Sequence, residues 1–198
     1  DYLAYDDVAT ETDWRVHEGY GALVAWHAAG LRVALQTPVS AIDTHGVQLV
    51  IRTPRGPIRA GKAIVTASTT VLARGAIRFG PSFDTVLHAA GSLPLGTAEK
   101  LFLAVDGAEA FDDNAHLMGN PRNPATGAYT LRPFGRPVIE VLLGGEGAAA
   151  AAAAGLDGAA AVAIEELCAL LGSEWRSRLR LLAGSSWTRD DHIGGGYS

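Results

Sequence analysis

One lysine stands inside an apolar segment, and its side chain is the strongest candidate for chemistry in the sequence. Lys100 follows the Gly- and Pro-containing loop 91–97 and opens the apolar run Leu101–Val105, which is typical of a buried strand. On a pleated strand, Lys100 shares one face with Phe102 and Ala104. A lysine is rarely fully buried without a partner. Two interpretations stay open: a strand-end lysine that reaches solvent, and a lysine that points into a cavity.

The other residue types that carry chemistry form only weak patterns. Cys168 is the one cysteine, so the sequence allows neither an intrachain disulfide nor a cysteine-based metal site, and its place on an apolar helix face indicates core. The six histidines are scattered without metal-ligand spacing. The segment Gly19-Tyr20-Gly21 begins like a dinucleotide fingerprint, but Val24 stands where the third glycine belongs. Phosphate binding there is the less favoured interpretation.

The elements that must position Lys100 indicate a mixed α/β chain. Helices are predicted over 22–29 and 84–90, and from an N-cap at Asp157 to a stop at Gly172. The seven-alanine tract 148–154 is expected to be a surface helix or a linker. The segment from 106 to 121 is expected to be irregular. Strands are predicted over 31–36, 37–43, 47–52, 57–60, 63–66, 100–105, 127–132, 137–143 and 178–187, and those before residue 61 are expected to form an antiparallel meander.

Composition excludes several function classes. The 198 residues are 48% hydrophobic, which indicates a globular protein with a substantial core. A formal net charge of −5 and the lack of a Lys/Arg cluster argue against nucleic-acid binding. We see no strongly apolar run of about 18 residues and therefore expect no membrane segment. The single cysteine fits a reducing compartment, so we expect a cytoplasmic protein.

Six short segments are informative through their order and spacing along the chain. They are 14–24 (Trp-Arg-Val-His-Glu-Gly-Tyr-Gly-Ala-Leu-Val), 35–42, 62–72, 77–81, 95–100 and 186–198. Each segment alone is a weak signal. Together they span nearly the whole chain and resemble the flavin-containing amine oxidases, the family of monoamine oxidases, polyamine oxidases and lysine-specific histone demethylases.

The resemblance implies FAD as the cofactor and gives four residues a role. Val39 matches a residue whose main chain binds the adenine of FAD. Lys100 matches a lysine that holds a water against the flavin N5, and Trp187 matches a tryptophan packed close to the flavin. Tyr197 matches one wall of an aromatic cage that steers the amine, so Lys100 and Tyr197 are the expected catalytic residues.

The glycine cluster near the end of the chain matches a segment beside the flavin. The resemblance implies that Gly195 and Gly196 belong to the cofactor-binding residues. Gly196 stands where the mammalian monoamine oxidases have the cysteine that bonds the flavin covalently. The resemblance therefore implies non-covalent FAD.

The implied reaction is the oxidation of a small-molecule amine. A hydride leaves the carbon next to a neutral amine for flavin N5, the imine hydrolyses, and O2 reoxidises the flavin with release of hydrogen peroxide. Two alternatives stay open. One is a flavoprotein of the same fold that acts on a non-amine substrate, as desaturases and porphyrinogen oxidases do. The other is a non-catalytic truncated relative or a binding module.

The resemblance also implies a two-domain fold of the mixed α/β class. Residues 1–72 are expected to be part of an FAD-binding domain and 73–186 a substrate domain with a mixed sheet flanked by helices. Residues 187–198 return to the FAD-binding domain. We expect the chain to be an internal fragment, because the family's amino-terminal fingerprint and its carboxy-terminal flavin segment have no counterpart in these residues.

Overall fold

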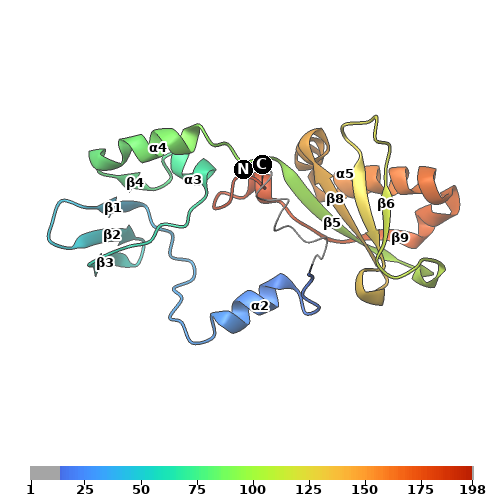
Figure 1. Cartoon of the computed structure of the whole chain (residues 1–198), viewed down its shortest axis with the longest axis horizontal. Helices are drawn as coiled ribbons and strands as arrows, with labels where there is room; N and C mark the ends of the chain where they lie inside the picture. Colours follow the sequence, from blue (N-terminus) through green and yellow to red (C-terminus); the bar gives the residue numbers. More distant parts are fainter. Residues whose placement is uncertain (1–13, 198) are drawn as a thin grey trace, which may run out of the picture. The chain divides into compact units, whose positions relative to one another are not determined.

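A computed structural model describes residues 14–197, and the chain divides into two compact units, 1–37 and 38–198 (Figure 1). In the first unit, helix α2 (Tyr20–His27) begins after Gly19, whose φ of 92° suits glycine. The strand predicted over 31–36 is wrong: these residues are exposed and form no strand. Alternation of apolar residues is not sufficient, because a strand also needs a neighbour for its backbone hydrogen bonds.

The second unit begins with a small four-stranded sheet. The strands are β1 (Ala41–Asp43), β2 (Leu49–Thr53), β3 (Gly56–Ala60) and β4 (Arg78–Phe79), in the order β3-β2-β1-β4. The pairs β1–β2 and β2–β3 are antiparallel, which confirms the predicted meander, while β4 lies parallel to β1. The strand predicted over 63–66 is wrong, because this segment pairs with no strand and Ile64 is exposed.

Short helices follow this sheet. Ser68 caps helix α3 (Thr69–Ala73), because its Oγ accepts a hydrogen bond from the N–H of Val71. The 3₁₀ turn η1 (Pro81–Phe83) leads into helix α4 (Asp84–Gly91), as predicted.

A five-stranded antiparallel sheet forms the larger part of the second unit. Its order is β6-β7-β8-β5-β9, and each adjacent pair of strands is antiparallel. Strand β6 falls in the segment expected to be irregular. It is a short edge strand whose alternate residues His116 and Met118 are exposed, so its apolar signal is weak. The strands are β5 (Ala98–Val105), β6 (Ala115–Met118), β7 (Gly127–Leu131), β8 (Val138–Gly144) and β9 (Leu179–Gly184).

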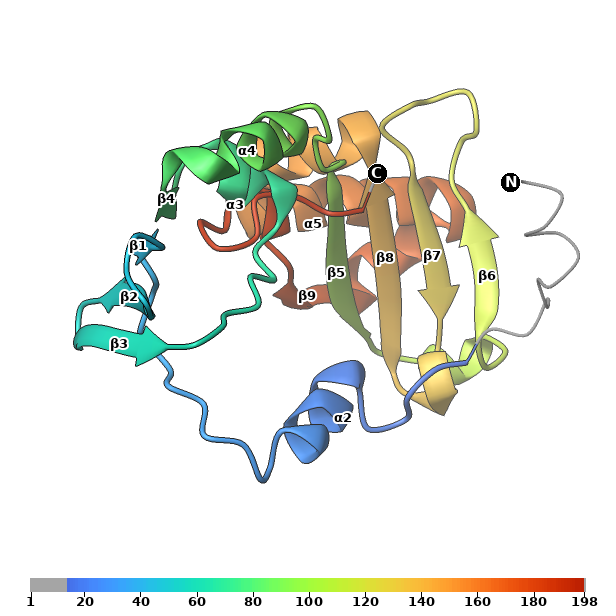
Figure 2. The same ribbon diagram turned by 60° about the vertical axis from the view of Figure 1, so that its left-hand side comes forward.

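Helix α5 (Gly145–Leu171) covers one face of this sheet and completes the core (Figure 2). The alanine tract, predicted to be a surface helix or a linker, forms the first part of α5: Ala149, Ala150, Ala153 and Ala154 are exposed, whereas Ala148 and Ala151 are buried against the sheet. Alanine gives little apolar contrast in a sequence, yet its small side chain lets a helix pack closely on a sheet. The helix is broken at Gly155, which has φ 74° and ψ 175°, so its second part starts close to the predicted start at Asp157. The predicted stop at Gly172 is confirmed.

Helix α5 is long and apolar enough to cross a membrane when length and composition alone are considered. In the structure, however, 33% of its most apolar window is buried, and Ala148, Ala160 and Leu167 pack into the core against the sheet. These contacts identify α5 as a core helix of this unit.

A partly buried carboxylate joins α5 to the beginning of β7. Glu166 accepts hydrogen bonds from Thr126 Oγ1, from the N–H of Gly127 at 2.9 Å and from Tyr129 Oη. Burial alone would raise the pKa of Glu166, but these hydrogen bonds outweigh burial and lower it. Burial and the neighbouring carboxylate raise the pKa of Tyr129 well above its ordinary value.

Candidate functional site

Lys100 lies on the face of the five-stranded sheet that α5 does not cover. Its β5 neighbours Leu101 and Leu103 point into the core under α5. On the other face, the Lys100 ammonium forms an ion pair with Glu140 of β8, which stands directly opposite Phe102. The Lys100 side chain is 35% exposed and Glu140 is buried. Lys100 is therefore neither a solvent-directed strand-end residue nor a fully buried one.

The Lys100–Glu140 pair borders a hollow of about 350 Å³. A row of polar side chains crosses the strands beside it: Thr130 stands opposite Glu140, and His116 stands opposite Thr130. Thr130 Oγ1 and His116 Nδ1 are 3.4 Å apart. The hollow thus combines the Lys100 ammonium, the buried Glu140 carboxylate and the Thr130–His116 pair on an otherwise apolar surface.

The glycine cluster packs against the start of β5. The N–H of Gly196 donates to the carbonyl of Gly96 at 2.8 Å. A Cβ on Gly196 would lie 2.7 Å from the Cβ of Ala98, so a side chain at 196 would require a shift of the backbone. Tyr197 follows directly and is 74% exposed. The structure therefore brings Gly196 and Tyr197 to the strand that carries Lys100, two residues before it.

Trp187 reaches the same strand through its backbone. It opens the 3₁₀ turn η5 (Trp187–Arg189) after β9, and its N–H donates to Glu99 Oε2 at 3.1 Å. Glu99 precedes Lys100 and faces the opposite side of the sheet. The sequence interpretation did not single out Glu99 or Glu140. The available signal was a charged residue inside an apolar run, which is rare unless it has partners.

Val39 lines a different hollow, of about 450 Å³, which does not include Lys100. Asp191 and His192, from the segment between Trp187 and the glycines, line this hollow too. Within the described residues 14–197, neither the backbone N–H nor the backbone C=O of Val39 forms a hydrogen bond with another backbone group. Main-chain groups beside a hollow can bind a planar heterocycle such as adenine.

The segment 191–196 runs from the hollow beside Val39 to the loop that precedes β5, the strand of Lys100. It begins at the hollow beside Val39, and Ser68 Oγ donates to the carbonyl of Ile193 at 2.6 Å. It ends at the contact of Gly196 with the loop before β5. Long cofactors have separate recognition and reaction ends, and the residues present fit such a ligand. Within the described part of the chain, no group of three or more His, Cys, Asp or Glu side chains is suited to holding a metal ion.

Comparison with known proteins identifies a family for the chain. The family described as "Flavin containing amine oxidoreductase" matches residues 5–198. The chain is 36% identical over 87 residues to lysine-specific histone demethylase 1B of Mus musculus, and 34% identical over 87 residues to lysine-specific histone demethylase 2 of Homo sapiens. Each alignment covers 43% of this chain, but only 10% and 11% of the respective relatives. The aligned part of the chain thus spans about a tenth of the length of these relatives.

Proposed function

Because the chain belongs to the family of flavin-containing amine oxidoreductases, we propose that the full-length protein oxidises an amine with O2 as the electron acceptor. The cofactor of the family is FAD, and we propose that it is held non-covalently here. The observation that carries the proposal is the position of Lys100 with Glu140 at a hollow, on the strand that also meets the glycine cluster.

The residues at the hollow have distinct roles in this proposal. A bound flavin supplies an acceptor for two electrons from the carbon next to the amine nitrogen. Lys100 would hold a water molecule beside a bound flavin, and its ammonium would favour negative charge that develops on the cofactor. Glu140 keeps the ammonium in place and balances its charge, which lowers the cost of partial burial. Tyr197 presents its ring to the incoming amine.

The domain organisation is part of the proposal. We assign residues 1–72 and 187–198 to an FAD-binding domain and 73–186 to a substrate domain. The contact of Ser68 with Ile193 supports this assignment, because it joins the two FAD-binding segments across more than 100 residues. The five-stranded sheet falls almost entirely within 73–186. A cytoplasmic location is proposed from the cysteine content alone.

A lysine-bearing peptide is the second candidate substrate, after a small-molecule amine. The observation that favours it is the identity of at least 34% to two proteins named lysine-specific histone demethylases. Both candidate substrates require the same flavin chemistry. They differ in the group attached to the reacting amine, which is a small molecule in one case and a peptide in the other.

The proposal is tested by mixing the purified full-length protein with candidate substrates without oxygen. We expect an amine to bleach the visible flavin absorption, and readmission of O2 to restore it with release of hydrogen peroxide. Small primary amines, polyamines and methyl-lysine peptides are compared to identify the substrate class. Bleaching by a non-amine only, or by none of these compounds, contradicts amine oxidation.

The attachment of the cofactor gives a separate prediction. Gly196 offers no thiol, and a cysteine Cβ at this position would lie within 3 Å of Ala98. We therefore expect acid precipitation of the full-length protein to release all of the flavin into the supernatant. The flavin absorbance of the supernatant and of the redissolved pellet is the measurement, and a yellow pellet would overturn the prediction.

A further inference from the structure

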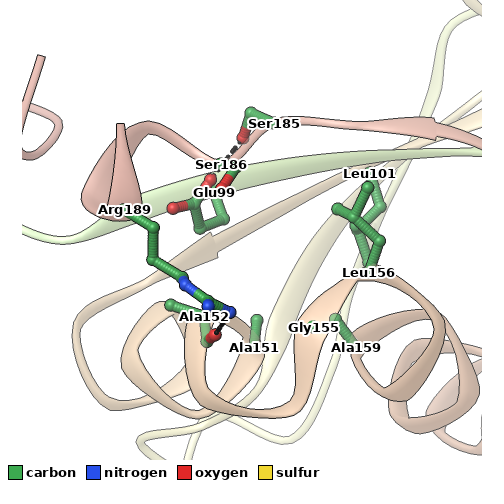
Figure 3. A pocket seen from close by; sticks show the side chains of 10 residues that line it. All are labelled: Glu99, Leu101, Ala151, Ala152, Gly155, Leu156, Ala159, Ser185, Ser186 and Arg189. Atoms are coloured by element: carbon green, nitrogen blue, oxygen red, sulfur yellow. Dashed lines mark hydrogen bonds between the residues drawn. The ribbon is translucent and has the colours of Figure 1, made fainter. Parts of the chain in front are cut away.

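Glu99 is a carboxylate that the proposed reaction does not use, although it neighbours Lys100. It is 3% exposed and lies on the α5 side of the sheet, where Leu101, Leu156 and Ser185 also border a hollow of about 140 Å³ (Figure 3). A charge in such surroundings is costly unless hydrogen bonds compensate it. The hydrogen-bond partners of Glu99 therefore explain how a carboxylate can occupy this buried position.

Three donors converge on Glu99, all of them from the segment that leaves β9. Ser185 Oγ donates to Oε2 at 2.6 Å, the N–H of Trp187 donates to Oε2 at 3.1 Å, and the N–H of Thr188 donates to Oε1 at 3.0 Å. Burial alone would raise the pKa of Glu99, but the hydrogen bonds from Ser185, Trp187 and Thr188 outweigh it and lower the pKa. Glu99 is thus ionised at neutral pH, and these hydrogen bonds are charge-assisted.

Ser185 extends these contacts to the backbone of Lys100. The N–H of Lys100 donates to Ser185 Oγ at 2.7 Å, and the N–H of Ser185 donates to the carbonyl of Lys100 at 2.8 Å. Lys100, Ser185, Glu99 and Trp187 therefore form one continuous hydrogen-bonded chain. The Glu99 carboxylate thus bridges the Ser185 hydroxyl, which contacts the Lys100 backbone, and the N–H of Trp187.

The same turn is attached to α5 on its other side. Figure 3 shows the Arg189 side chain reaching to the helix, where its Nη1 donates to the carbonyl of Ala152 at 3.1 Å. Ala152 lies three residues before the break at Gly155, near the end of the first part of α5. A cation is favoured at the carboxyl end of a helix. The η5 turn is therefore held at both ends, by Glu99 at its start and by Arg189 at its close.

We propose that Glu99 is a positioning residue for the amine oxidation: it fixes the Trp187 turn at a set distance from the strand that carries Lys100. The inference rests on the proposed function, in which Lys100 and Trp187 both lie beside the flavin. Glutamine has one acceptor oxygen in place of two, so Glu99→Gln leaves the N–H of Trp187 or of Thr188 facing an amide NH2 group. The turn then loses its fixed spacing without a change in the size of the residue.

The test compares Glu99→Gln with the wild type in the full-length flavoprotein. We expect amide hydrogen exchange in a peptide that covers 183–194 to become at least about tenfold faster, because charge-assisted hydrogen bonds are lost locally. Exchange in 127–143, within the same sheet, serves as the internal reference and should not change. We also expect an altered visible spectrum of the bound flavin and a kcat about tenfold lower with little change in KM. Glu109→Gln, which changes an exposed carboxylate outside this cluster, is the matched control.

The outcomes separate this inference from the proposed function. Unchanged exchange in 183–194, or equal acceleration in both peptides, overturns the positioning role even if the wild type oxidises amines. Faster local exchange with an unchanged flavin spectrum and unchanged kcat overturns it as well, because Glu99 is then only structural. If Glu99→Gln does not fold, Ser185→Ala breaks the same chain at one link and is expected to show the same local pattern to a smaller extent.

Discussion

Replacing Lys100 with methionine is expected to lower turnover with oxygen by at least about tenfold, which corresponds to about 1.4 kcal/mol of transition-state stabilisation. Methionine keeps an unbranched side chain of similar size and removes the charge and the donors. In the proposed reaction, the variant would lose the group that holds a water beside the flavin and the cation that favours negative charge on the cofactor. Folding and flavin content should stay close to those of the wild type, apart from a loss of stability that arises from the buried Glu140.

Glu140 determines the control for this experiment. The Lys100→Met change removes the ammonium that pairs with the buried Glu140 carboxylate, and such a change can destabilise a protein by itself. In the double variant Lys100→Met/Glu140→Gln the carboxylate charge is removed as well, so stability should recover while turnover stays low. Stopped-flow measurement of both half-reactions, together with thermal melts, separates the two effects. Wild-type rates in both half-reactions would show that Lys100 has no part in the chemistry.

Replacing Glu166 with glutamine is expected to lower the free energy of unfolding by about 2 kcal/mol at pH 7. The carboxylate accepts hydrogen bonds from Thr126, Gly127 and Tyr129, and an amide can satisfy only some of these donors. Because the pKa of Glu166 is lowered in the folded state from its ordinary value of 4.5, its stabilisation is complete above pH 4.5. It is lost as the pH falls through the lower, folded-state pKa. The difference between wild type and variant should therefore shrink in acid.

Urea unfolding at pH 7 and at a series of acidic pH values measures this difference. Glu165→Gln is the matched control, since Glu165 is the preceding residue on α5 and forms an exposed ion pair with Arg176. Exposed ion pairs contribute about 0–1 kcal/mol, so this variant should differ little from the wild type. A loss for Glu166→Gln that equals that of the control, or that stays constant down to low pH, would contradict the role assigned to the Glu166 carboxylate.

The sequence predicted the large sheet better than the elements that surround it. Strands β5, β7 and β8 are buried, and their apolar runs mark them clearly. Strand β6 escaped prediction because an edge strand needs no continuous apolar face. The burial of Ala148 could not be predicted, because helix propensity does not show which side of an alanine tract meets a sheet. The error at 31–36 has the opposite cause, since its residues alternate in type but have no neighbouring strand.

The candidate site was predictable only where a single residue stood out. Lys100 did so because a charge in an apolar run needs a partner, but the identity of that partner depends on the pairing of β5 with β8, 40 residues away. The contact of Gly196 with Gly96 likewise joins segments 100 residues apart. The roles of Val39, Trp187, Gly195 and Tyr197 came from resemblance alone and stay predictions. Glu99 shows what resemblance leaves out, because its significance appears only when the backbone of the η5 turn is in place.

The order of the strands has a consequence for how this protein acquires its structure. Strands β6, β7 and β8 are neighbours in both sequence and space, so they can form as a local meander. Strand β5 precedes them in the chain but pairs only with β8 and β9. On a ribosome that adds about 5–20 residues each second, β5 therefore emerges several seconds before β9, its later partner. During that interval an apolar strand with an unpaired edge is exposed, and this is the stage at which a chaperone would protect the nascent chain from aggregation.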